Sequence, residues 1–421
     1  MCGIAGVFAY NTDQIVEKDV VINMRDVMTH RGPDGAGIWI SSDERVGLAH
    51  RRLSIIDLSD IANQPMSNED DSIWVLFNGE IYNHDEIRQT LEKMGGHQWK
   101  TDHSDTEVIL HAYETWGIDF LHKLRGMFSI ALWDGREQTL WLIRDRIGIK
   151  PLYYTVTNGQ ICFASEIKAL LQHPDVTARV NEDVLYAYLS FLTTPAPQTL
   201  FEGIYKLEPG TWMRCKRDGD ITTHRYYELW DHVQETQKNE DELAEEILDT
   251  LRTAVKLRKV SDVPVGVFLS GGIDSSTNTA LFSEDATDPV KTFSIGYEGD
   301  TDYQTYTNEL HFARQMAQSV GAEAHELLLT VDDLLDFLPR MVYLQDEPIA
   351  DPVCVPVYYV SKLARENGVT VSQVGEGADE LFWGYPSWKD SLNLQKNTRY
   401  TTGNACTTRR MGLAANRTLL R

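Results

Sequence analysis

The sequence predicts two domains of different fold class: a β-rich layered sandwich in the first half and a doubly wound α/β domain in the second. The chain has 421 residues, which is enough for two or three domains of ordinary size. Short apolar runs separated by turn residues fill the first half, whereas apolar strands alternate with helical patterns in the second. Because 42% of the residues are hydrophobic and 24% are charged, the composition is that of a globular protein.

The first half, up to about residue 210, contains short runs with the pattern of strands. These runs are 37–40, 73–77, 127–133, 140–143 and 161–164. Two helical patterns interrupt them. One follows Asn83 and places Ile87, Leu91 and Met94 on one face; the other follows Asp105 and has Val108, Ile109, Ala112 and Tyr113 at helical spacing. Strands followed by amphipathic helices favour a layered sandwich.

We expect a first domain over residues 2–210, a linker over 211–240, a second domain over 241–386 and an atypical basic tail over 387–421. The linker assignment follows from its polar, acidic composition. The second domain begins with a helical pattern and continues with strands expected at 263–269, 291–296 and 368–372 and helices at 310–320 and 355–365. The tail is either weakly structured or forms a short helix near residues 410–420.

The composition excludes several function classes. A net charge of -24 argues against a nucleic-acid partner, because such sites need a basic surface. The five cysteines show neither a CxxC pair nor metal-ligand spacing, which favours a reducing cytoplasm. No apolar run reaches the ~18 residues of a membrane helix, and no basic region precedes the apolar N-terminus. We therefore expect a cytoplasmic protein without a membrane partner.

Cys2 is the first candidate for catalysis. If Met1 is removed, this residue carries both a thiol, with an ordinary pKa near ~8.5, and an α-amine, with an ordinary pKa near ~7.7–8.0. The amine can then accept the thiol proton, so one residue supplies nucleophile and base. An isolated cysteine is more often a small buried hydrophobic residue. The motifs that follow favour the catalytic interpretation.

A glycine-rich loop at 270–276 follows an apolar strand and precedes a helical stretch. Adjacent Gly271 and Gly272 let backbone N–H groups approach an anion, and a helix N-terminus adds a favourable dipole. Ser270 and Ser275 can donate to phosphate oxygens, and Asp274 can hold Mg²⁺ beside them. The loop is not a Walker A motif, since no Gly-Lys-Ser/Thr follows. The alternative is an ordinary glycine-rich turn between strand and helix.

A second acidic loop, at 375–380, ends another apolar strand. The carboxyl ends of parallel strands meet at the ligand crevice, so Glu376 and Asp379 are expected to face the same site as the loop at 270–276. Three carboxylates around a nucleotide require metal ions to neutralise them. Alone, the Gly-Glu-Gly sequence is equally typical of a solvated acidic loop.

In the first half, Asn78 and Gly79 follow a strand. Asn-Gly is also the strongest short hairpin signal. The functional interpretation is an oxyanion site, in which the Asn78 side chain and the Gly79 N–H donate to a developing negative oxygen. Basic groups at Arg31 and Arg52 suit a substrate carboxylate. Asp105 at a helix start is by default an N-cap, although a carboxylate there could equally bind a substrate ammonium group.

Together these residues resemble the glutamine-dependent asparagine synthetases of the class II, N-terminal nucleophile amidotransferase type. The resemblance runs from Cys2 to about Tyr385 and includes Cys-Gly-Ile-Ala-Gly, Arg-Gly-Pro-Asp, Arg-Leu-Ser-Ile, Asn-Gly-Glu-Ile-Tyr-Asn, Ser-Asp-Thr-Glu, Ser-Gly-Gly-Ile-Asp-Ser-Ser and Gly-Glu-Gly-Ala-Asp-Glu. It implies a four-layer αββα glutaminase domain and a PP-loop domain of the adenine nucleotide α-hydrolase type. The second domain is expected to be incomplete at its C-terminal end.

The resemblance also implies roles for residues of the glutaminase domain. Cys2 would attack the glutamine side-chain amide with its own α-amine as base, and Asn78 with Gly79 would form the oxyanion hole. The implied glutamine-binding residues are Arg52, Ile56, Asn78, Gly79, Glu80 and Asp105.

In the second domain, the implied ATP-binding residues are Leu269, Ser270, Gly271, Gly272, Asp274, Ser275, Ile295 and Gly375. Asp274 and Asp379 would ligate Mg²⁺, and Glu376 would support the acyl-adenylate.

The implied activity is that of an ATP-dependent carbon–nitrogen ligase making asparagine from aspartate, with glutamine as the nitrogen donor and ATP and Mg²⁺ as cofactors. Amidation of another carboxylate, such as a sugar acid in polysaccharide assembly, is an alternative. A further alternative is a remnant with only glutaminase activity or a binding role. The expected partners are small-molecule substrates, and a homodimer is one assembly that the resemblance allows.

Overall fold

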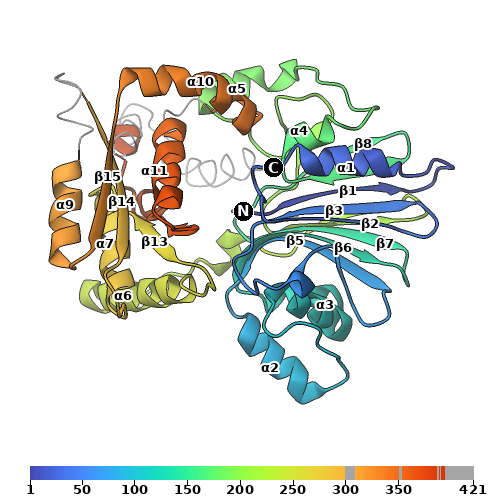
Figure 1. Cartoon of the computed structure of the whole chain (residues 1–421), viewed down its shortest axis with the longest axis horizontal. Helices are drawn as coiled ribbons and strands as arrows, with labels where there is room; N and C mark the ends of the chain where they lie inside the picture. Colours follow the sequence, from blue (N-terminus) through green and yellow to red (C-terminus); the bar gives the residue numbers. More distant parts are fainter. Residues whose placement is uncertain (299–308, 350–352, 386–387, 389, 394–421) are drawn as a thin grey trace, which may run out of the picture.

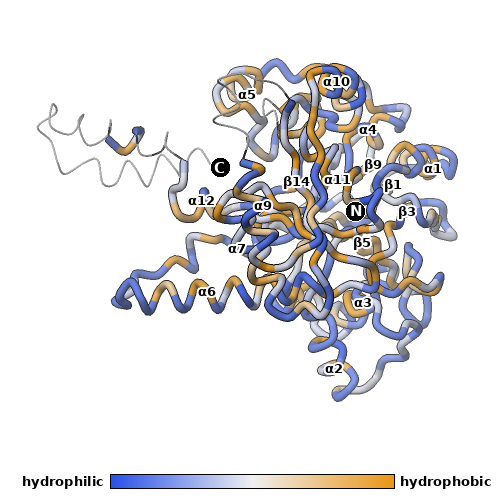
Figure 2. Tube along the Cα trace, turned by 60° about the vertical axis from the view of Figure 1, so that its left-hand side comes forward, coloured by the Kyte–Doolittle hydropathy of each residue, from blue (hydrophilic) through white to orange (hydrophobic). Residues whose placement is uncertain are grey.

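The computed structural model describes residues 1–298, 309–349, 353–385, 388 and 390–393. Figure 1 shows two domains side by side, with the first domain built from two stacked β-sheets between two layers of helices. This arrangement confirms the expected αββα sandwich. Figure 2 shows the same two domains from another side.

The first sheet places the N-terminus at its centre. Its strands follow the order β10-β8-β9-β1-β3-β2, and every pairing among them is antiparallel. Their bounds are β1 (Gly3–Ala9), β2 (Gly35–Ile40), β3 (Val46–Arg52), β8 (Tyr153–Thr157), β9 (Gln160–Ala164) and β10 (Ile204–Lys206). The helices α1 (Lys18–Asp26) and α4 (Ile167–Leu170) pack on the outer face of this sheet. Strand β1, which begins one residue after Cys2, therefore has neighbours on both sides.

The second sheet has the order β12-β11-β7-β6-β5-β4. Its strands are β4 (Met66–Ser67), β5 (Ile73–Ile81), β6 (Gly126–Asp134), β7 (Thr139–Arg144), β11 (Thr211–Lys216) and β12 (Ile221–Arg225). The helices α2 (His84–Met94) and α3 (Asp105–Trp116) cover its outer face. Both helices were expected from the sequence, but Met94 is exposed because it is the last residue of α2.

Apolar side chains from both sheets fill the space between them. Phe8 of β1 is fully buried there and packs against Trp133 of β6, with ring centroids 5.0 Å apart. Alternation along β1 directs its other side chains, among them Val7 and Ala9, towards α1 and α4. A single strand thus contributes to two of the three interlayer cores, which fixes the position of its first residue.

The second domain contains a four-stranded parallel sheet of order β15-β14-β13-β16. The strands are β13 (Val265–Phe268), β14 (Lys291–Tyr297), β15 (Glu323–Leu329) and β16 (Val371–Gln373). Helices lie on both faces, as the doubly wound prediction requires (Figure 1). They are α6 (Glu240–Leu257), α7 (Ile273–Ser283), α9 (Leu310–Ser319), α10 (Val331–Gln345), α11 (Cys354–Glu366) and α12 (Ala378–Phe382).

The chain runs from β13 to β14 and β15 on one side and then returns to β16 on the other. The topological switch point therefore lies between β13 and β16, where ligands bind in sheets of this kind. The loops at 269–272 and 374–377 leave the carboxyl ends of these two neighbouring strands. The fold thus brings together the two loops that the sequence predicted to share a site.

One expectation on the domain boundary needs correction. The linker expected over 211–240 is wrong for residues 211–225, because β11 and β12 pair with each other and β11 pairs with β7 in the second sheet. Their alternating half-buried pattern is that of edge strands, which explains the polar composition. Helix α6 begins at Glu240 with a capping box from Asn239 and Glu242.

The helical pattern expected at the start of the second domain is α6, and among its residues only Val255 is buried. Figure 2 shows hydrophilic and hydrophobic residues along its whole length. The expectation for the tail at 387–421 falls mostly outside the described residues, which include only 388 and 390–393 of that range. Among the described residues, no helix combines the length and apolar character needed to cross a membrane.

Short helices and loops complete the first domain. They include α5 (Leu185–Phe191), whose described residues are all at least partly exposed. Among the described cysteines, Cys2, Cys162 and Cys215 form no disulfide bond.

We expect Phe8→Ala to lower the free energy of unfolding of the first domain by about 3–5 kcal/mol, because it leaves a cavity between two sheets that cannot collapse onto it. The exposed Phe191 of α5 provides a matched control, and Phe191→Ala should change this free energy by about 0.5 kcal/mol or less. Denaturant titration followed by tryptophan fluorescence measures both. Equal midpoint shifts for the two variants would contradict the assigned core.

Candidate functional sites

Cys2 lies immediately before β1, and its thiol faces the loop after β3. The Leu53 N–H approaches Sγ at 3.4 Å, and Sγ lies 3.7 Å from the Leu53 carbonyl oxygen. Burial raises the pKa of the Cys2 thiol, although the contact with the Leu53 backbone and the neighbouring N-terminal ammonium oppose that rise. A thiol in this environment needs a nearby base before it can act as a nucleophile.

The α-amine at the chain start lies in the same buried environment. Here it belongs to Met1, one residue before the amine that Cys2 would carry after processing. Burial lowers the pKa of the Met1 α-ammonium to about 5, and the charges of Arg31 and Lys150 act in the same direction. An amine with a pKa of about 5 is neutral at pH 7, so its lone pair is available, but the same low pKa makes it a weak base towards a thiol of raised pKa.

Asn78 and Gly79 lie on β5, in the sheet that faces β1. Asn78 is buried, and its Nδ2 has only a long contact of 3.5 Å to Ser129 Oγ. Its Oδ1 is buried without a hydrogen-bond partner among the described residues. A Cβ atom on Gly79 would lie 2.2 Å from the Met127 carbonyl oxygen, so only glycine fits there. Internal contacts therefore leave the Asn78 amide able to donate a hydrogen bond to a substrate, as an oxyanion site requires.

Arg52 ends β3 and is buried among backbone carbonyls of the following loop. Nη1 donates to Ser59 O at 2.8 Å and to Asn63 Oδ1 at 3.0 Å, while Nη2 donates to Asp57 O and, at 3.4 Å, to Ile56 O. The Nε–H takes part in none of these four bonds. A substrate carboxylate at this site would use Nε–H or displace one of the loop acceptors.

Glu80 and Asp105 form a pair of buried carboxyl groups. Burial and the neighbouring Asp105 hold the pKa of Glu80 well above its usual range. Burial raises the pKa of Asp105 to about 6, against a hydrogen bond of 3.1 Å from the Ile81 N–H. Asp105 is the first residue of α3, and Ser104 occupies the N-cap position, so the default N-cap interpretation is wrong. Two desolvated carboxyl groups suit a substrate ammonium group, which would compensate their charge.

Lys150 was not among the site residues predicted from the sequence, although it is buried and its charge interacts with Glu80. Burial lowers its pKa, while the charge of Glu80 opposes that shift. It is held by the turn at 145–150, in which the buried Asp145 carboxylate accepts hydrogen bonds from the N–H groups of Ile147, Gly148, Ile149 and Lys150. Gly148 has a φ of 75° within this turn. The sequence signal that could have indicated this turn is Asp145 followed by Gly148 just after a strand.

In the second domain, the loop after β13 folds around two hydroxyl groups. Ser270 Oγ and Ser275 Oγ are 2.9 Å apart, and Gly272 N–H donates to Ser270 Oγ at 3.3 Å. Gly271 has a φ of 93°, and a Cβ there would lie 2.6 Å from the Glu309 carbonyl oxygen. The loop leads directly into α7, whose N-terminus favours an anion.

Gly375 packs directly against this loop. A Cβ atom on Gly375 would lie 2.7 Å from Ser275 N and from the Asp274 carbonyl carbon. Burial raises the pKa of Asp274, and the nearby charges of Asp379 and Glu380 raise it further. Like charges gathered at a switch point provide the oxygen ligands that Mg²⁺ prefers, so the residues present fit this ion. Glu376 follows Gly375 in the same loop and is exposed.

Leu269 and Ile295 contribute differently from the loop residues. Leu269 is buried against Ala313 and Ala317 of α9, and its backbone N–H and carbonyl are paired with Phe293 and Ser294. Ile295 is half-buried against the cluster that joins β14 to α11. We expect any contact of these two residues with a nucleotide to be apolar.

A chain of ion pairs joins the two domains. Arg31 donates from Nε to the Cys2 carbonyl oxygen at 2.9 Å and from Nη1 to Glu166 Oε1 at 3.0 Å. Lys168 then bridges Glu166 Oε2, at 2.6 Å, and Asp346 Oδ1, at 2.9 Å, just after α10. Although burial opposes it, His30, Arg31 and Lys168 lower the pKa of Glu166 to about 2. We call this set the Arg31–Asp346 chain.

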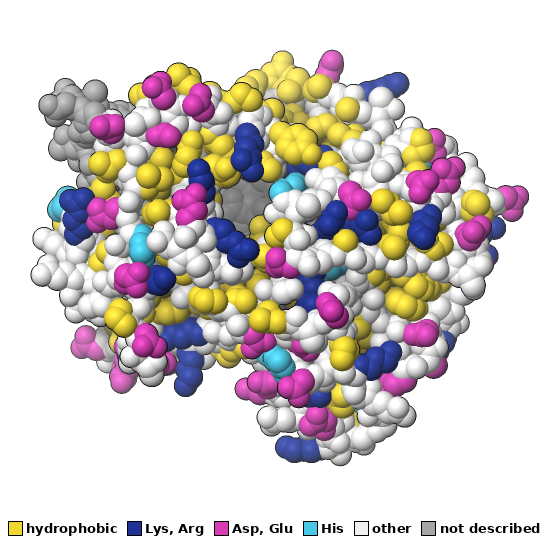
Figure 3. All heavy atoms as spheres, viewed as in Figure 1, with side chains coloured by type: hydrophobic (Ala, Val, Ile, Leu, Met, Phe, Trp, Pro, Cys, Tyr) yellow, Lys and Arg dark blue, Asp and Glu magenta, His cyan; other side chains and the backbone are white. Residues whose placement is uncertain are grey.

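A second contact between the domains involves the loop that surrounds Arg52. Asp262, before β13, accepts from the Asp57 N–H at 2.7 Å, and its own N–H donates to the Ile55 carbonyl at 2.9 Å. The same carboxylate lies 2.7 Å from His103 Nε2. Figure 3 shows a hollow between the two domains, bordered by Lys and Arg, Asp and Glu, His and apolar side chains.

Comparisons with known families agree with the division of the chain into two domains. The family described as "Glutamine amidotransferase domain" matches residues 1–227, and the family described as "Asparagine synthase" matches residues 246–420. The first match includes β11 and β12, as the structure does. The second extends beyond Tyr385, where the motifs used for the resemblance end.

Three relatives illustrate the similarity. Asparagine synthetase (glutamine-hydrolyzing) 1 of Bacillus subtilis is 40% identical over 408 residues, which cover 96% of this chain and 62% of that protein. Enzyme 3 of the same organism is 33% identical, covering 94% of this chain and 65% of its own length. A Methanocaldococcus jannaschii protein, whose name assigns it provisionally to the same activity, is 34% identical and covers 91% and 76%.

The chain spans less than two thirds of the length of the two B. subtilis enzymes. Both halves nevertheless match, in the order that the structure separates into two domains. The chain belongs to the family of glutamine-hydrolysing asparagine synthetases.

Proposed function

We propose that this chain is a cytoplasmic asparagine synthase that takes nitrogen from glutamine and uses ATP to activate aspartate. The observation that carries the proposal is the presence of two candidate sites in one chain. One site combines Cys2 with the side-chain amide of Asn78, whose Nδ2 makes only a long contact among the described residues. The other combines two glycine-rich loops at the switch point of a parallel sheet. Family membership supports the same conclusion. A homodimer is a candidate assembly.

In the first site, Met1 must be removed before Cys2 can act. The Cys2 amine then accepts the thiol proton, and Sγ attacks the side-chain amide carbon of glutamine. Asn78 Nδ2 and the Gly79 N–H donate to the oxygen that becomes negative. Ammonia leaves as the C–N bond breaks, and water hydrolyses the glutamyl thioester to glutamate. Arg52 would bind the α-carboxylate, and Glu80 with Asp105 the α-ammonium group.

In the second site, the loop at 270–275 would bind the phosphates of ATP. The aspartate carboxylate attacks the α-phosphorus, and pyrophosphate leaves. Ammonia then attacks the acyl-adenylate carbon, and AMP leaves with asparagine formed. Mg²⁺, when held by Asp274 and Asp379, would neutralise phosphate charge there. Ile295 and Gly375 would contact the nucleotide, and Glu376 would lie beside the activated carboxylate.

The identity of the carboxylate that accepts the nitrogen rests on family membership more than on geometry, so we test it with a direct assay. Glutamate release from glutamine and pyrophosphate release from Mg-ATP are measured in parallel on the purified chain, with aspartate or a sugar acid as acceptor. We expect both activities with aspartate. Pyrophosphate release only with the sugar acid would support the alternative acceptor. Glutamate without any pyrophosphate would restrict the function to glutaminase.

We predict that Cys2→Ala reduces glutamate release to background while pyrophosphate release with free ammonia and aspartate persists. The substitution removes only the nucleophile of the first site. Cys215→Ala, at a buried cysteine on β11, is the matched control and should retain glutamate release. Loss of the ammonia-dependent activity in Cys2→Ala would contradict a division into two sites.

We predict that Asn78→Ala lowers kcat for glutamate release by about 10²–10³-fold with little change in KM, since the amide would act on the transition state. Asn78→Asp keeps the shape but replaces the N–H donor with oxygen, so it should lose as much. Steady-state kinetics check both variants. A raised KM with an unchanged kcat would instead assign Asn78 to substrate binding.

We predict that Asp274→Asn abolishes pyrophosphate release but leaves glutamate release intact, because a carboxylate ligand at the phosphate site is lost. The control is Asp285→Asn, at an exposed aspartate whose nearest cation is Lys259 at 3.8 Å. Pyrophosphate release measured against Mg²⁺ concentration distinguishes the two. An unchanged Mg²⁺ dependence in Asp274→Asn would refute its role as a metal ligand.

A further inference from the structure

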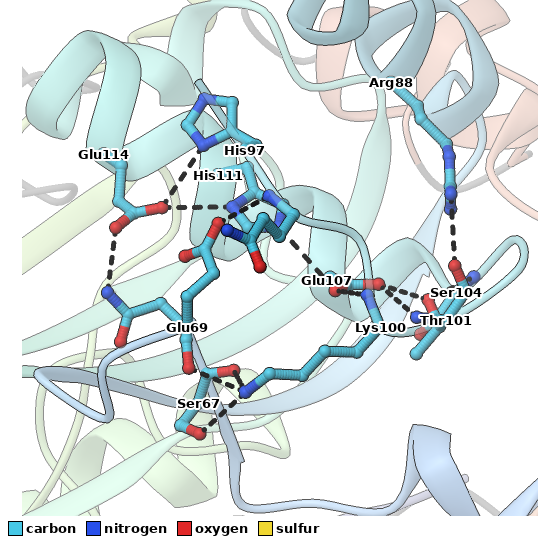
Figure 4. A network of polar contacts seen from close by, with 12 residues as sticks. Ser67, Glu69, Arg88, His97, Lys100, Thr101, Ser104, Glu107, His111 and Glu114 are labelled. Atoms are coloured by element: carbon cyan, nitrogen blue, oxygen red, sulfur yellow. Dashed lines mark hydrogen bonds and ion pairs between the residues drawn. The ribbon is translucent and has the colours of Figure 1, made fainter. Parts of the chain in front are cut away.

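A cluster of histidine and glutamate side chains lies on the outer face of the first domain, away from both sites above. His111 and Glu114 come from α3, Glu69 from the turn between β4 and β5, and His97 from the segment between α2 and α3. One potential ligand atom from each residue lies within 4.8 Å of the other three. Figure 4 shows His97 and His111 both directed at the Glu114 carboxylate.

The spacing of these atoms fits a tetrahedral metal site. Glu114 Oε2 lies 3.0 Å from His111 Nδ1 and 3.5 Å from His97 Nδ1. In a tetrahedral zinc site, ligand bonds of about 2.0–2.2 Å place neighbouring ligand atoms roughly 3.3–3.6 Å apart. The His97–Glu114 distance falls in this range and the His111–Glu114 distance is shorter, while all four atoms lie within 4.8 Å of one another, so an ion would require some side-chain adjustment. His111 and Glu114 are three residues apart on α3 and so share one helix face.

Three of the four potential ligands also have an outer hydrogen bond that holds their orientation. His97 Nε2 lies 2.8 Å from Thr115 Oγ1, whereas His111 Nε2 lies 3.6 Å from Glu107 Oε1 and has no hydrogen-bond partner among the described residues. Metal-binding histidines commonly direct their second ring nitrogen at such acceptors. Both contacts leave Nδ1 of each ring facing the centre of the cluster.

The carboxylates show the same feature. Glu114 Oε1 accepts from Asn68 Nδ2 at 2.8 Å, and Glu69 Oε1 accepts from the Gln98 N–H at 2.7 Å. Each therefore has one oxygen fixed by the protein and the other available. Glu107 is held in turn by the Lys100 and Thr101 N–H groups, at 2.6 and 2.8 Å. This network lies within one helix, one turn and one connecting segment.

We propose that His97, His111, Glu114 and Glu69 form a structural site for a divalent transition-metal ion, with zinc as the preferred ion. Two imidazoles and two carboxylates match zinc better than Mg²⁺ or Ca²⁺, which prefer oxygen ligands alone. The ion would fasten the β4–β5 turn and the segment before α3 to the helix. The proposal is independent of glutamine hydrolysis and of ATP use.

The same side chains also form ion pairs when His111 is protonated, since it faces Glu107 and Glu114. That arrangement needs no metal. In that arrangement the charge of Glu69 also raises the pKa of His111, but the Nδ1 atoms of both rings need not face the same Glu114 oxygen. Competition between the two states is measurable, because zinc binding displaces protons from its ligands.

The test uses the full chain, stripped of metal with a chelator and titrated with Zn²⁺ against a chromophoric competitor. We expect one zinc per chain and a higher thermal midpoint with zinc than without, whereas Mg²⁺ should not compete. His97→Ala and Glu69→Gln should weaken zinc binding, the former by at least about 100-fold. Thr115→Val, which removes only an outer contact, should weaken it by about 10-fold.

The matched control is His122→Ala, because His122 is an exposed histidine of the same domain outside the cluster. It should bind zinc as the unaltered chain does. Glu69→Gln replaces an exposed side chain, so its fold should persist even if His97→Ala proves unstable. Absence of one tightly bound zinc in the unaltered chain, or equal affinity in Glu69→Gln, His97→Ala and His122→Ala, would overturn the proposal and leave an ion-pair network only.

Discussion

Strand β1 begins one residue after Cys2 and is held between β3 and β9, and the candidate glutaminase site depends on this constraint. Its side chains enter the cores on both faces of the sheet, so its first residue cannot shift without disturbing two layers. Burial raises the pKa of the Cys2 thiol and lowers that of the α-ammonium group at the chain start.

The second domain contributes to the order of this site. Asp262 holds the backbone of residues 55–57, and the carbonyls of Ile56 and Asp57 in turn surround Arg52. Asp346 reaches the chain start through Lys168, Glu166 and Arg31. Both contacts use carboxylates of the second domain on groups near Cys2 or Arg52. The two halves are therefore joined by polar contacts beside the candidate glutaminase site.

Much of this organisation could be predicted from the sequence, because its signals are local. The loop at 270–275 combines a strand end with adjacent glycines, and the pair Asn78–Gly79 lies within β5 at a position where only glycine fits, so each signal acts within a few residues. Glu166 could not be predicted as a site neighbour, since it lies 135 positions from its partner Arg31. The linker prediction failed for 211–225 because edge strands are polar on one face. Composition alone does not separate them from a loop.

The Arg31–Asp346 chain has a consequence for exchanging domains between related enzymes. Lys168 and Asp346 are buried on opposite sides of the junction, and burial raises the pKa of Asp346 despite Lys168. A chimera that keeps one partner and replaces the other would leave an uncompensated charge in a desolvated position, a change that typically costs about 3–5 kcal/mol. A working hybrid would therefore need to transfer residues 166–168 together with Asp346.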